Sequence, residues 1–408
     1  MVLCWVLLWT VATRLDSAAT QNPDCAEYVY SHGRAWCKDG APTPGTAAAV
    51  SLNPIARVPS VARPSAAVIT ALTDVKGALR RAYDLKDSTA NQMASLHLLD
   101  TPPGETGYSA VYMSMQHGKT WEVRSATSTD LMTWSYANTL LPNADMPYAY
   151  RLAPNGWILL VHEQWMRTGP GGSAGPSRLG FKLYYNHSDL MEGRHFNSFV
   201  APLSVGQHTG LEGTPNVYSA KQVYRDGYYM VDATIGFHFN DATGVDQVAH
   251  GTLTSFGPTV VSPTWAAAQS TAYDDAFKQA GAIGNIGQRD SGVLGGELLL
   301  LQEGNTGHMP PTIWAAWKLW LYTPAQDESF PPAGNGTITE LLPVTDGGST
   351  AFGNPSFKVV PCPSSGTDGD WLVGDCVFVS FFAFGEGAAP GEAGVVAFYN
   401  RAPNTTAV

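Results

Sequence analysis

The sequence predicts an all-β protein whose main body is a five-bladed β-propeller. Only 14% of its 408 residues are charged, and the 42 glycines, 12 tryptophans and 17 tyrosines favour turns and strands over long surface helices. From about residue 90 onward, short apolar strands alternate with turns in five segments of similar length. Repeats of this kind, each the size of a small antiparallel sheet, are typical of propeller blades.

The five segments span residues 90–143, 144–205, 210–262, 283–343 and 350–401. Each begins with a cluster of small or polar residues, such as "ADMPYAYRL", "LEGTPNVYSA" or "FGNPSFKVV", and continues into apolar strands. In the run "STDLMTW" of the first segment, we expect Asp130 to hold a turn and Trp134 to pack against the next blade. A pair of β-sandwiches or a barrel with the same strand spacing is the alternative fold.

The first 89 residues differ from the repeats in composition and pattern. Residues 1–19 combine an apolar run with small residues near its end, which is typical of a signal peptide, and an uncleaved anchor is the alternative. Residues 20–89 are expected to form a disulfide-containing segment and an extended wrap rich in alanine and proline. The propeller then occupies residues 90–408.

Two elements are expected within this N-terminal segment. The run "TDVKGALRRAY" at 73–83 has apolar residues at helical spacing and predicts one short helix. The run "AAVITAL" at 66–72 is expected to form a strand that completes the last blade, because a propeller must close its ring.

Cysteines and sequons predict a secreted glycoprotein. Without the leader, four cysteines remain, and an even number fits an oxidising compartment. Three pairings are possible, and we expect Cys25 with Cys37 and Cys362 with Cys376, since each pair closes a short loop. Sequons lie at Asn186, Asn335 and Asn404. No later segment has the length of a membrane span, so no stable membrane association is expected once the leader is removed.

Charge and motifs exclude several classes of function. A net charge of −11 argues against binding to nucleic acid, whose phosphates need basic patches. The chain has neither a phosphate-binding glycine loop nor a metalloprotease or serine-hydrolase motif. We therefore expect no organic cofactor and no metal ligands, although a calcium ion in the channel is left open.

The openings of the blades predict the functional site. In a propeller, the first strand of each blade lines the central channel, so the residues that begin these strands gather at one rim. Those residues are Asn91, Asp145, Glu212, either Gln288 or Arg289, and either Gly353 or Asn354. Carboxylates, an arginine and amides in one mouth suit glycoside hydrolysis, in which an acid protonates the leaving oxygen and a carboxylate activates water or attacks. We expect Glu212 to be the acid and Asp145 its partner.

Four further residues are expected to bind the substrate. Asn91 and Arg289 can bond sugar hydroxyls, although Arg289 can instead form a structural ion pair. Tyr148 and Trp165 can stack on the C–H faces of a sugar ring, although most aromatic side chains in such a fold are core. Glu163 is expected to bond between blades, and a sugar contact is the alternative.

Several motifs resemble the blade signatures of the five-bladed propeller glycosidases of glycoside hydrolase family 43. They are "EGTPNVY", "RDGYYMV", "ADMPYAYRLAPNGWILLVHEQ", "STDLMTW" and "GNPSF", and the resemblance covers about residues 90–400. The family includes arabinanases, β-xylosidases and arabinofuranosidases and is related to invertase and levansucrase. Its members use an aspartate base, a second aspartate that orients the substrate, and a glutamate acid. The resemblance implies that Glu212 is the acid and that Asp145 is the second aspartate.

The first blade departs from that family pattern. Asn91 stands where an acidic base is expected, and an amide cannot take a proton from water. Asp84, Asp87 and Asp100 are the nearby carboxylates that could substitute. The alternative functions are a carbohydrate-binding propeller that has lost hydrolysis, and a structural secreted protein with no ligand at its channel.

Overall fold

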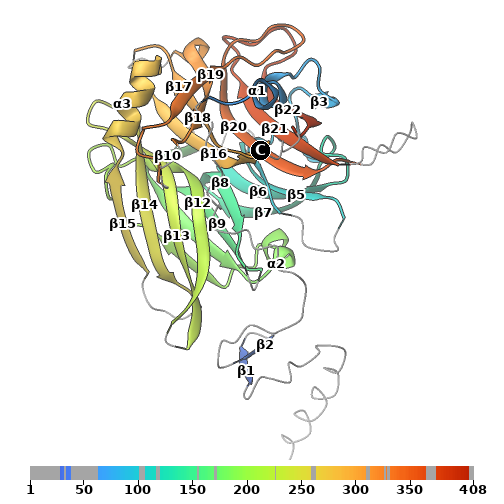
Figure 1. The fold of residues 1–408 in the computed structure, drawn as a ribbon. Coiled ribbons are helices and arrows are strands. Elements are labelled where there is room, and N and C mark those ends of the chain that lie inside the picture. The colour runs from blue at the N-terminus through green and yellow to red at the C-terminus, as the bar shows by residue number, and fades with distance from the viewer. Residues whose placement is uncertain are drawn as a thin grey trace, which may run out of the picture.

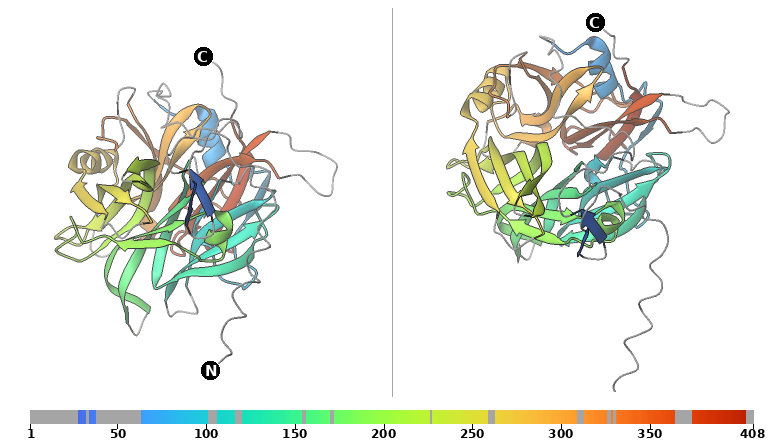
Figure 2. Two further views of the ribbon diagram at one scale, coloured as in Figure 1. Left: turned by 90° about the horizontal axis from the view of Figure 1, so that it is seen from below. Right: turned by 60° about the horizontal axis from the view of Figure 1, so that its bottom comes forward.

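The protein is a five-bladed β-propeller. The computed structural model describes residues 63–100, 106–115, 120–153, 156–169, 172–225, 227–258, 263–308, 313–325, 328, 331–363 and 374–403, and the backbone of β1 (Tyr28–Ser31) and β2 (Arg34–Cys37). Five four-stranded sheets surround a common centre, and β1 and β2 pair separately (Figure 2). The first strands of neighbouring blades contact one another in cyclic order, so they form the innermost ring. The fold prediction is confirmed, and the sandwich and barrel alternatives are wrong.

Four blades each consist of four consecutive antiparallel strands (Figure 1). Blade 1 contains β4 (Ala94–Leu98), β5 (Tyr108–Met115), β6 (Trp121–Ser128) and β7 (Ser135–Pro142). Blade 2 contains β8 (Ala144–Arg151), β9 (Ile158–Gly169), β10 (Gly172–Tyr184) and β11 (Asn197–Val200). Blade 3 contains β12 (Glu212–Arg225), β13 (Tyr228–Asn240), β14 (Asp246–Phe256) and β15 (Thr264–Gln269). Blade 4 contains β16 (Ile286–Leu294), β17 (Glu297–Asn305), β18 (Trp317–Thr323) and β19 (Thr337–Leu341).

Blade 5 joins the two ends of the propeller. It contains β20 (Phe352–Pro361), β21 (Asp375–Ala383), β22 (Gly394–Arg401) and, as its outermost strand, β3 (Arg80–Ala82). An N-terminal strand therefore closes the ring, as expected, but it comes from residues 80–82. The assignment of this strand to residues 66–72 is wrong.

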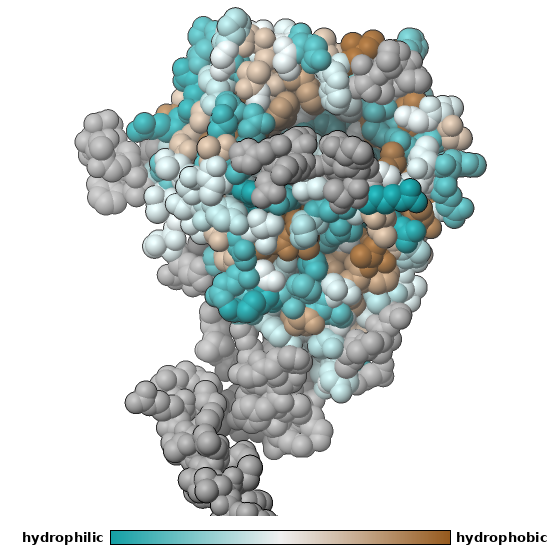
Figure 3. All heavy atoms as spheres, turned by 180° about the vertical axis from the view of Figure 1, so that it is seen from behind, coloured by the Kyte–Doolittle hydropathy of each residue, from teal (hydrophilic) through white to brown (hydrophobic). Residues whose placement is uncertain are grey.

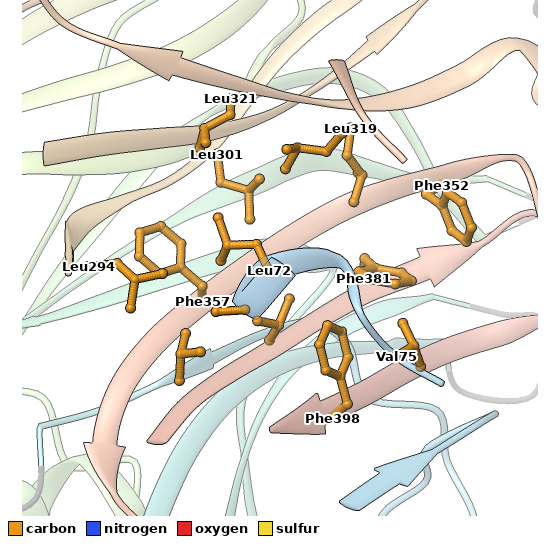
Figure 4. Packing of buried hydrophobic residues seen from close by; sticks show 14 of the residues in the cluster. Leu72, Val75, Leu294, Leu301, Leu319, Leu321, Phe352, Phe357, Phe381 and Phe398 are labelled. Atoms are coloured by element: carbon orange, nitrogen blue, oxygen red, sulfur yellow. The ribbon is translucent and has the colours of Figure 1, made fainter. Parts of the chain in front are cut away.

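Residues 66–73 instead form helix α1 (Ala66–Thr73). Ser65 caps its N-terminus by accepting a hydrogen bond from the backbone N–H of Val68. Val68 and Leu72, four positions apart, are buried with leucines of blade 4 and phenylalanines of blade 5. Figure 4 shows Leu72 among these side chains. Burial at helical spacing fixes this run as a helix, because a strand would bury alternate residues.

The helix predicted at 73–83 is also wrong. Asp74 ends α1, and its carboxylate accepts the backbone N–H of Gly77, which makes a turn. The chain then enters β3. Two further α-helices lie outside the strands, α2 (His187–Met191) and α3 (Thr271–Ala280), so the prediction of a single helix is wrong.

Other expectations on local structure are confirmed. Cys362 and Cys376 form a disulfide between β20 and β21. Asp130 accepts the backbone N–H groups of Met132 and Thr133 in its turn, and Trp134 is buried in a cluster of residues from blade 1 and the neighbouring blade 5. The side chains of the other expected pair, like the leader, lie outside the described residues.

The face shown in Figure 3 has apolar side chains scattered among hydrophilic ones. Among the described residues, no helix is long and apolar enough to cross a membrane.

Candidate functional site

The first strand of every blade carries a break in its pairing near its start. In four blades, the break contains a non-glycine residue with a left-handed backbone. These residues are Ser95, Met146, Thr214 and Asn354, with φ between 46° and 50°. Such bulges redirect side chains, and left-handed non-glycine residues are strained and gather at functional sites. The openings of four blades are therefore specialised in the same way.

These openings meet at one pocket in the centre of the ring. The pocket is small and partly open, and its space including the open mouth is about 290 Å³. The lining residues come from blades 1, 2, 3 and 5: Ser95, His97, Met146, Pro147, Tyr148, Thr214, Pro215, Asn354, Pro355 and Ser356. The expectation that blade openings gather at one rim holds for these four blades.

A buried hydrogen-bond network centred on Asp290 connects residues that line the pocket. Asp290 of β16 accepts the hydroxyl of Tyr148 at 3.1 Å through Oδ1, and the hydroxyl of Ser356 at 3.0 Å through Oδ2. The backbone N–H groups of Ser291 and Phe357 donate to the same carboxylate. One aspartate thus connects blades 2, 4 and 5.

Burial sets the protonation states of Asp290, of Tyr148, and of His97, whose Nε2 lies 3.9 Å from Asp290 Oδ1. It raises the pKa of Asp290 to about 6, against the hydrogen bonds that favour the charged form. Burial and the positive charge of Lys358 lower the pKa of His97 to about 3, and burial raises the pKa of Tyr148 well above its usual value. At neutral pH, His97 is therefore neutral and Tyr148 is a hydrogen-bond donor.

Three buried polar atoms near the pocket make no hydrogen bond with any described residue. They are His97 Nδ1, Thr214 Oγ1 and Asn216 Nδ2. Buried polar atoms almost always have a partner, and each exception calls for an explanation, such as an unobserved water or a ligand. His97 and Thr214 both line the pocket.

Asp145 and Trp165 lie together beside the pocket, at the opening of blade 2. The indole Nε1 of Trp165 donates to Asp145 Oδ2 at 2.9 Å. Asp145 is only 3% exposed and directly precedes Met146, which lines the pocket. Its partner across the sheet is Glu163 of β9, so two carboxylates share this opening.

Glu163 reaches from blade 2 to blade 3. Its Oε2 accepts the backbone N–H of Thr214 at 3.3 Å, which confirms the expected bond between blades. A Cβ atom on Gly213 would lie 1.8 Å from that oxygen, so a side chain there would displace the Glu163 carboxylate. In the same way, Glu303 of blade 4 accepts the backbone N–H of Asn354 at 2.6 Å, and its carboxylate would contact a Cβ atom on Gly353. The glycines in "EGTP" and "FGNP" thus make room for a carboxylate of the preceding blade.

Glu212 is fully buried and does not line the pocket. Its Oε1 accepts the backbone N–H groups of Ser204, Val205 and Gly206 at 2.7, 2.7 and 2.9 Å. The carboxylate therefore holds the loop that leads into β12. A general acid must lie within hydrogen-bond reach of the leaving oxygen, and the described geometry does not place Glu212 there.

Asn91 lies away from the pocket, in a turn. Its backbone N–H donates to Asp87 Oδ1 at 3.1 Å, and its side chain donates to Thr89. Arg289 lies in β16, directly before Asp290, and its side chain is outside the described part of the structure.

The three aspartates considered as substitutes for the base have structural partners. Asp87 accepts bonds from Tyr112 and Arg124 in the core of blade 1. Asp84 pairs with Lys86, and Asp100 pairs with Lys358 at 2.7 Å. None of the three lines the pocket.

The sequence reasoning missed His97, Asp290 and Ser356. These residues follow the bulge of their blade, and a proline in the bulge marks it in "MPY", "TPN" and "NPS". Aligning on that proline would have brought Tyr148 and Ser356 to equivalent positions. Blades 1 and 4 have no such proline, so no signal marked His97 or Asp290.

No protein-family model matches the chain, and no curated protein matches it either. A solved glycoside hydrolase matches with a TM-score of 0.49 and 10% identity, covering 85% of this chain and 98% of its own. An endo-arabinase from Bacteroides thetaiotaomicron matches with a TM-score of 0.40 and 10% identity, covering 78% and 97%. A GDP-Man-dependent mannosyltransferase from Leishmania mexicana matches with a TM-score of 0.40 and 9% identity, covering 80% and 91%. Matches at this level of similarity establish neither a family nor an activity for this chain.

Proposed function

We propose that this protein is a secreted glycoside hydrolase that binds carbohydrate at the mouth of its central channel. The observation that carries the proposal is the set of unpartnered buried polar atoms at the pocket, His97 Nδ1, Thr214 Oγ1 and Asn216 Nδ2. A sugar offers both hydroxyl donors and acceptors, which is the chemistry these atoms need. Trp165 adds an aromatic face beside them, and its indole is fixed by Asp145.

Hydrolysis requires two carboxyl groups on opposite sides of the glycosidic oxygen. Asp145 supplies one at the opening of blade 2. Glu212 supplies the other, as the blade signature implies, and this role requires the loop at 204–206 to release its carboxylate when the substrate binds. Catalytic contacts often form only in the complex with substrate, so a bonded carboxylate in the free protein is compatible with the role.

The second candidate is a carbohydrate-binding propeller without hydrolysis. It is favoured by the three backbone N–H groups that hold Glu212. In this function, the pocket binds the sugar and no carboxylate needs to move.

The first experiment measures hydrolysis of chromogenic arabinosides, xylosides, galactosides and fructosides by the purified protein. Glu212→Gln and Asp145→Asn are compared with Glu340→Gln, which changes an exposed carboxylate on the outermost strand of blade 4. Loss of turnover in the first two variants alone supports the hydrolase. If wild-type protein hydrolyses nothing but binds a glycan array, the second candidate replaces it. Absence of both activities contradicts both.

Secretion has its own test. The leader at 1–19 and the disulfide between Cys362 and Cys376 support it. We expect the full chain, produced in eukaryotic cells, to accumulate in the medium with a new N-terminus near residue 20. Retention of the uncleaved chain in the cells contradicts this part of the proposal.

A further inference from the structure

Three aromatic side chains, Trp314, Trp317 and Phe384, form a stack between blades 4 and 5, which we call the aromatic shelf. The ring of Phe384 lies 5.1 Å from that of Trp314 and 6.0 Å from that of Trp317. The two indoles lie 6.5 Å apart and are inclined by 23°. Trp314 is 45% exposed, whereas Trp317 is only 6% exposed. The shelf therefore has a buried base and an open upper ring.

The aromatic shelf lies at the same end of the propeller as the pocket. Strands alternate in direction, so the connection from β17 to β18, which holds Trp314, lies at the end where each first strand begins. Contact with the pocket wall supports this placement. A Cβ atom on Gly353 would lie 2.7 Å from the ring of Phe384, and the next residue, Asn354, lines the pocket.

Packing between blades explains only part of this arrangement. Phe384 and Trp317 fit that account, because they fill space between neighbouring sheets. Trp314 does not, since almost half of a large indole faces solvent while the ring is held in place by two aromatic partners. In addition, Trp317 Nε1 is buried and makes no hydrogen bond with any described residue, although buried indole N–H groups usually have an acceptor.

We propose that the aromatic shelf is a sugar-binding subsite and that the ligand is a glycan chain of several residues. This proposal rests on the proposed binding of carbohydrate at the channel mouth. Flat, rigid aromatic rings suit the apolar C–H faces of sugar rings, and a sugar hydroxyl is a suitable acceptor for an indole N–H.

The position of the shelf determines the path of the glycan. The pocket lies between Trp165, which bonds the opening of blade 2, and the aromatic shelf, which contacts the opening of blade 5. The pocket is small, so a glycan of several units must extend beyond it. A glycan that crosses the mouth of the pocket from Trp165 to Trp314 contacts both aromatic side chains.

The test is calorimetric titration with arabino-, xylo-, galacto- and fructo-oligosaccharides of increasing length, including the monosaccharides. For the series that binds, we expect affinity to rise with length in the wild type. Trp314→Ala should weaken binding of the longer members about tenfold and leave the monosaccharide unaffected. Trp314→Phe should retain most of the affinity, because a flat ring remains.

The matched control is Tyr228→Ala. Tyr228 is 49% exposed and begins β13 at the opposite end of the propeller, so this variant should bind like the wild type. Unchanged binding of long oligosaccharides by Trp314→Ala, or an equal loss for the monosaccharide, overturns the subsite while leaving the proposed function intact. If the wild type binds none of the four series, the proposed function fails together with the subsite.

Discussion

The hydroxyl of Tyr148 in blade 2 donates a hydrogen bond to Asp290 in blade 4, 3.1 Å away, at the centre of the propeller. Asp290 also accepts the hydroxyl of Ser356 in blade 5. Tyr148 and Ser356 both line the pocket. A carboxylate that contacts no solvent thus fixes two walls of the site.

The burial of Asp290 predicts a pH dependence of stability. Burial raises the pKa of Asp290 from 3.8 to about 6, so the folded protein binds this proton more tightly than the unfolded chain. The contribution of Asp290 to the free energy of unfolding is therefore fully present below about pH 4, and it falls as pH rises to about 6. Its total change is up to about 3 kcal/mol.

The contribution of Asp290 is isolated by comparing the wild type with Asp290→Asn in urea unfolding between pH 4 and pH 7.5. The comparison is needed because His97, whose pKa is lowered to about 3, has the opposite effect on stability over this range. The asparagine amide also faces a backbone N–H, which costs stability at every pH. We expect the advantage of the wild type to shrink as pH rises. A difference that is constant or grows contradicts the assignment.

The close approach of the Glu163 carboxylate to Gly213 predicts that a side chain at position 213 destabilises the fold. In Gly213→Ala, the new methyl group collides with the Glu163 carboxylate, and we expect the free energy of unfolding to fall by about 1–3 kcal/mol. Gly385→Ala is the control, because a Cβ atom there meets nothing within 4 Å. The double variant Glu163→Ala/Gly213→Ala should lose less than the two single losses combined. If the two single losses simply add, the contact between residue 213 and the Glu163 carboxylate is not the cause of the destabilisation.

The loop before β12 depends on Glu212. Glu212→Ala leaves three backbone N–H groups without their acceptor, and we expect a loss of several kcal/mol, about 1–3 for each donor that finds no water. Glu212→Gln keeps an oxygen at that position and should cost less. Hydrogen exchange at residues 204–206 measures this directly. Equal protection in wild type and Glu212→Ala rules out the proposed support of the loop.

The disulfide predicts a redox-dependent stability. Cys362 and Cys376 are separated by 14 positions, and closing a loop of this length contributes about 3 kcal/mol in the chain-entropy account. Reduction, or replacement of both cysteines by serine, should lower the thermal midpoint. The measurement is thermal unfolding with and without reductant. Reductant should lower the thermal midpoint of the wild type and leave that of the double variant unchanged.

The blades could be predicted because strand, turn and strand recur within each segment, and this signal is local. Residues 66–72 were misassigned because their apolar run is compatible with a strand or a helix, and the deciding contacts come from blades 4 and 5. Asn91 was misplaced because the opening of blade 1 lies at Ala94 and Ser95, where no proline marks the bulge. The hydrogen-bond network around Asp290 could not be predicted, since it depends on side chains that the bulges bring together from distant segments.

The pairing of β3 with β22 has a consequence for how the protein is made. Residues 80–82 leave the ribosome before any blade exists, and their partner emerges more than three hundred residues later. Until then, the edge of β3 has no strand to pair with, and contacts this distant in sequence form slowly. The last blade is therefore completed only after translation of residue 401, and a ribosome that stops within blade 5 releases an open ring.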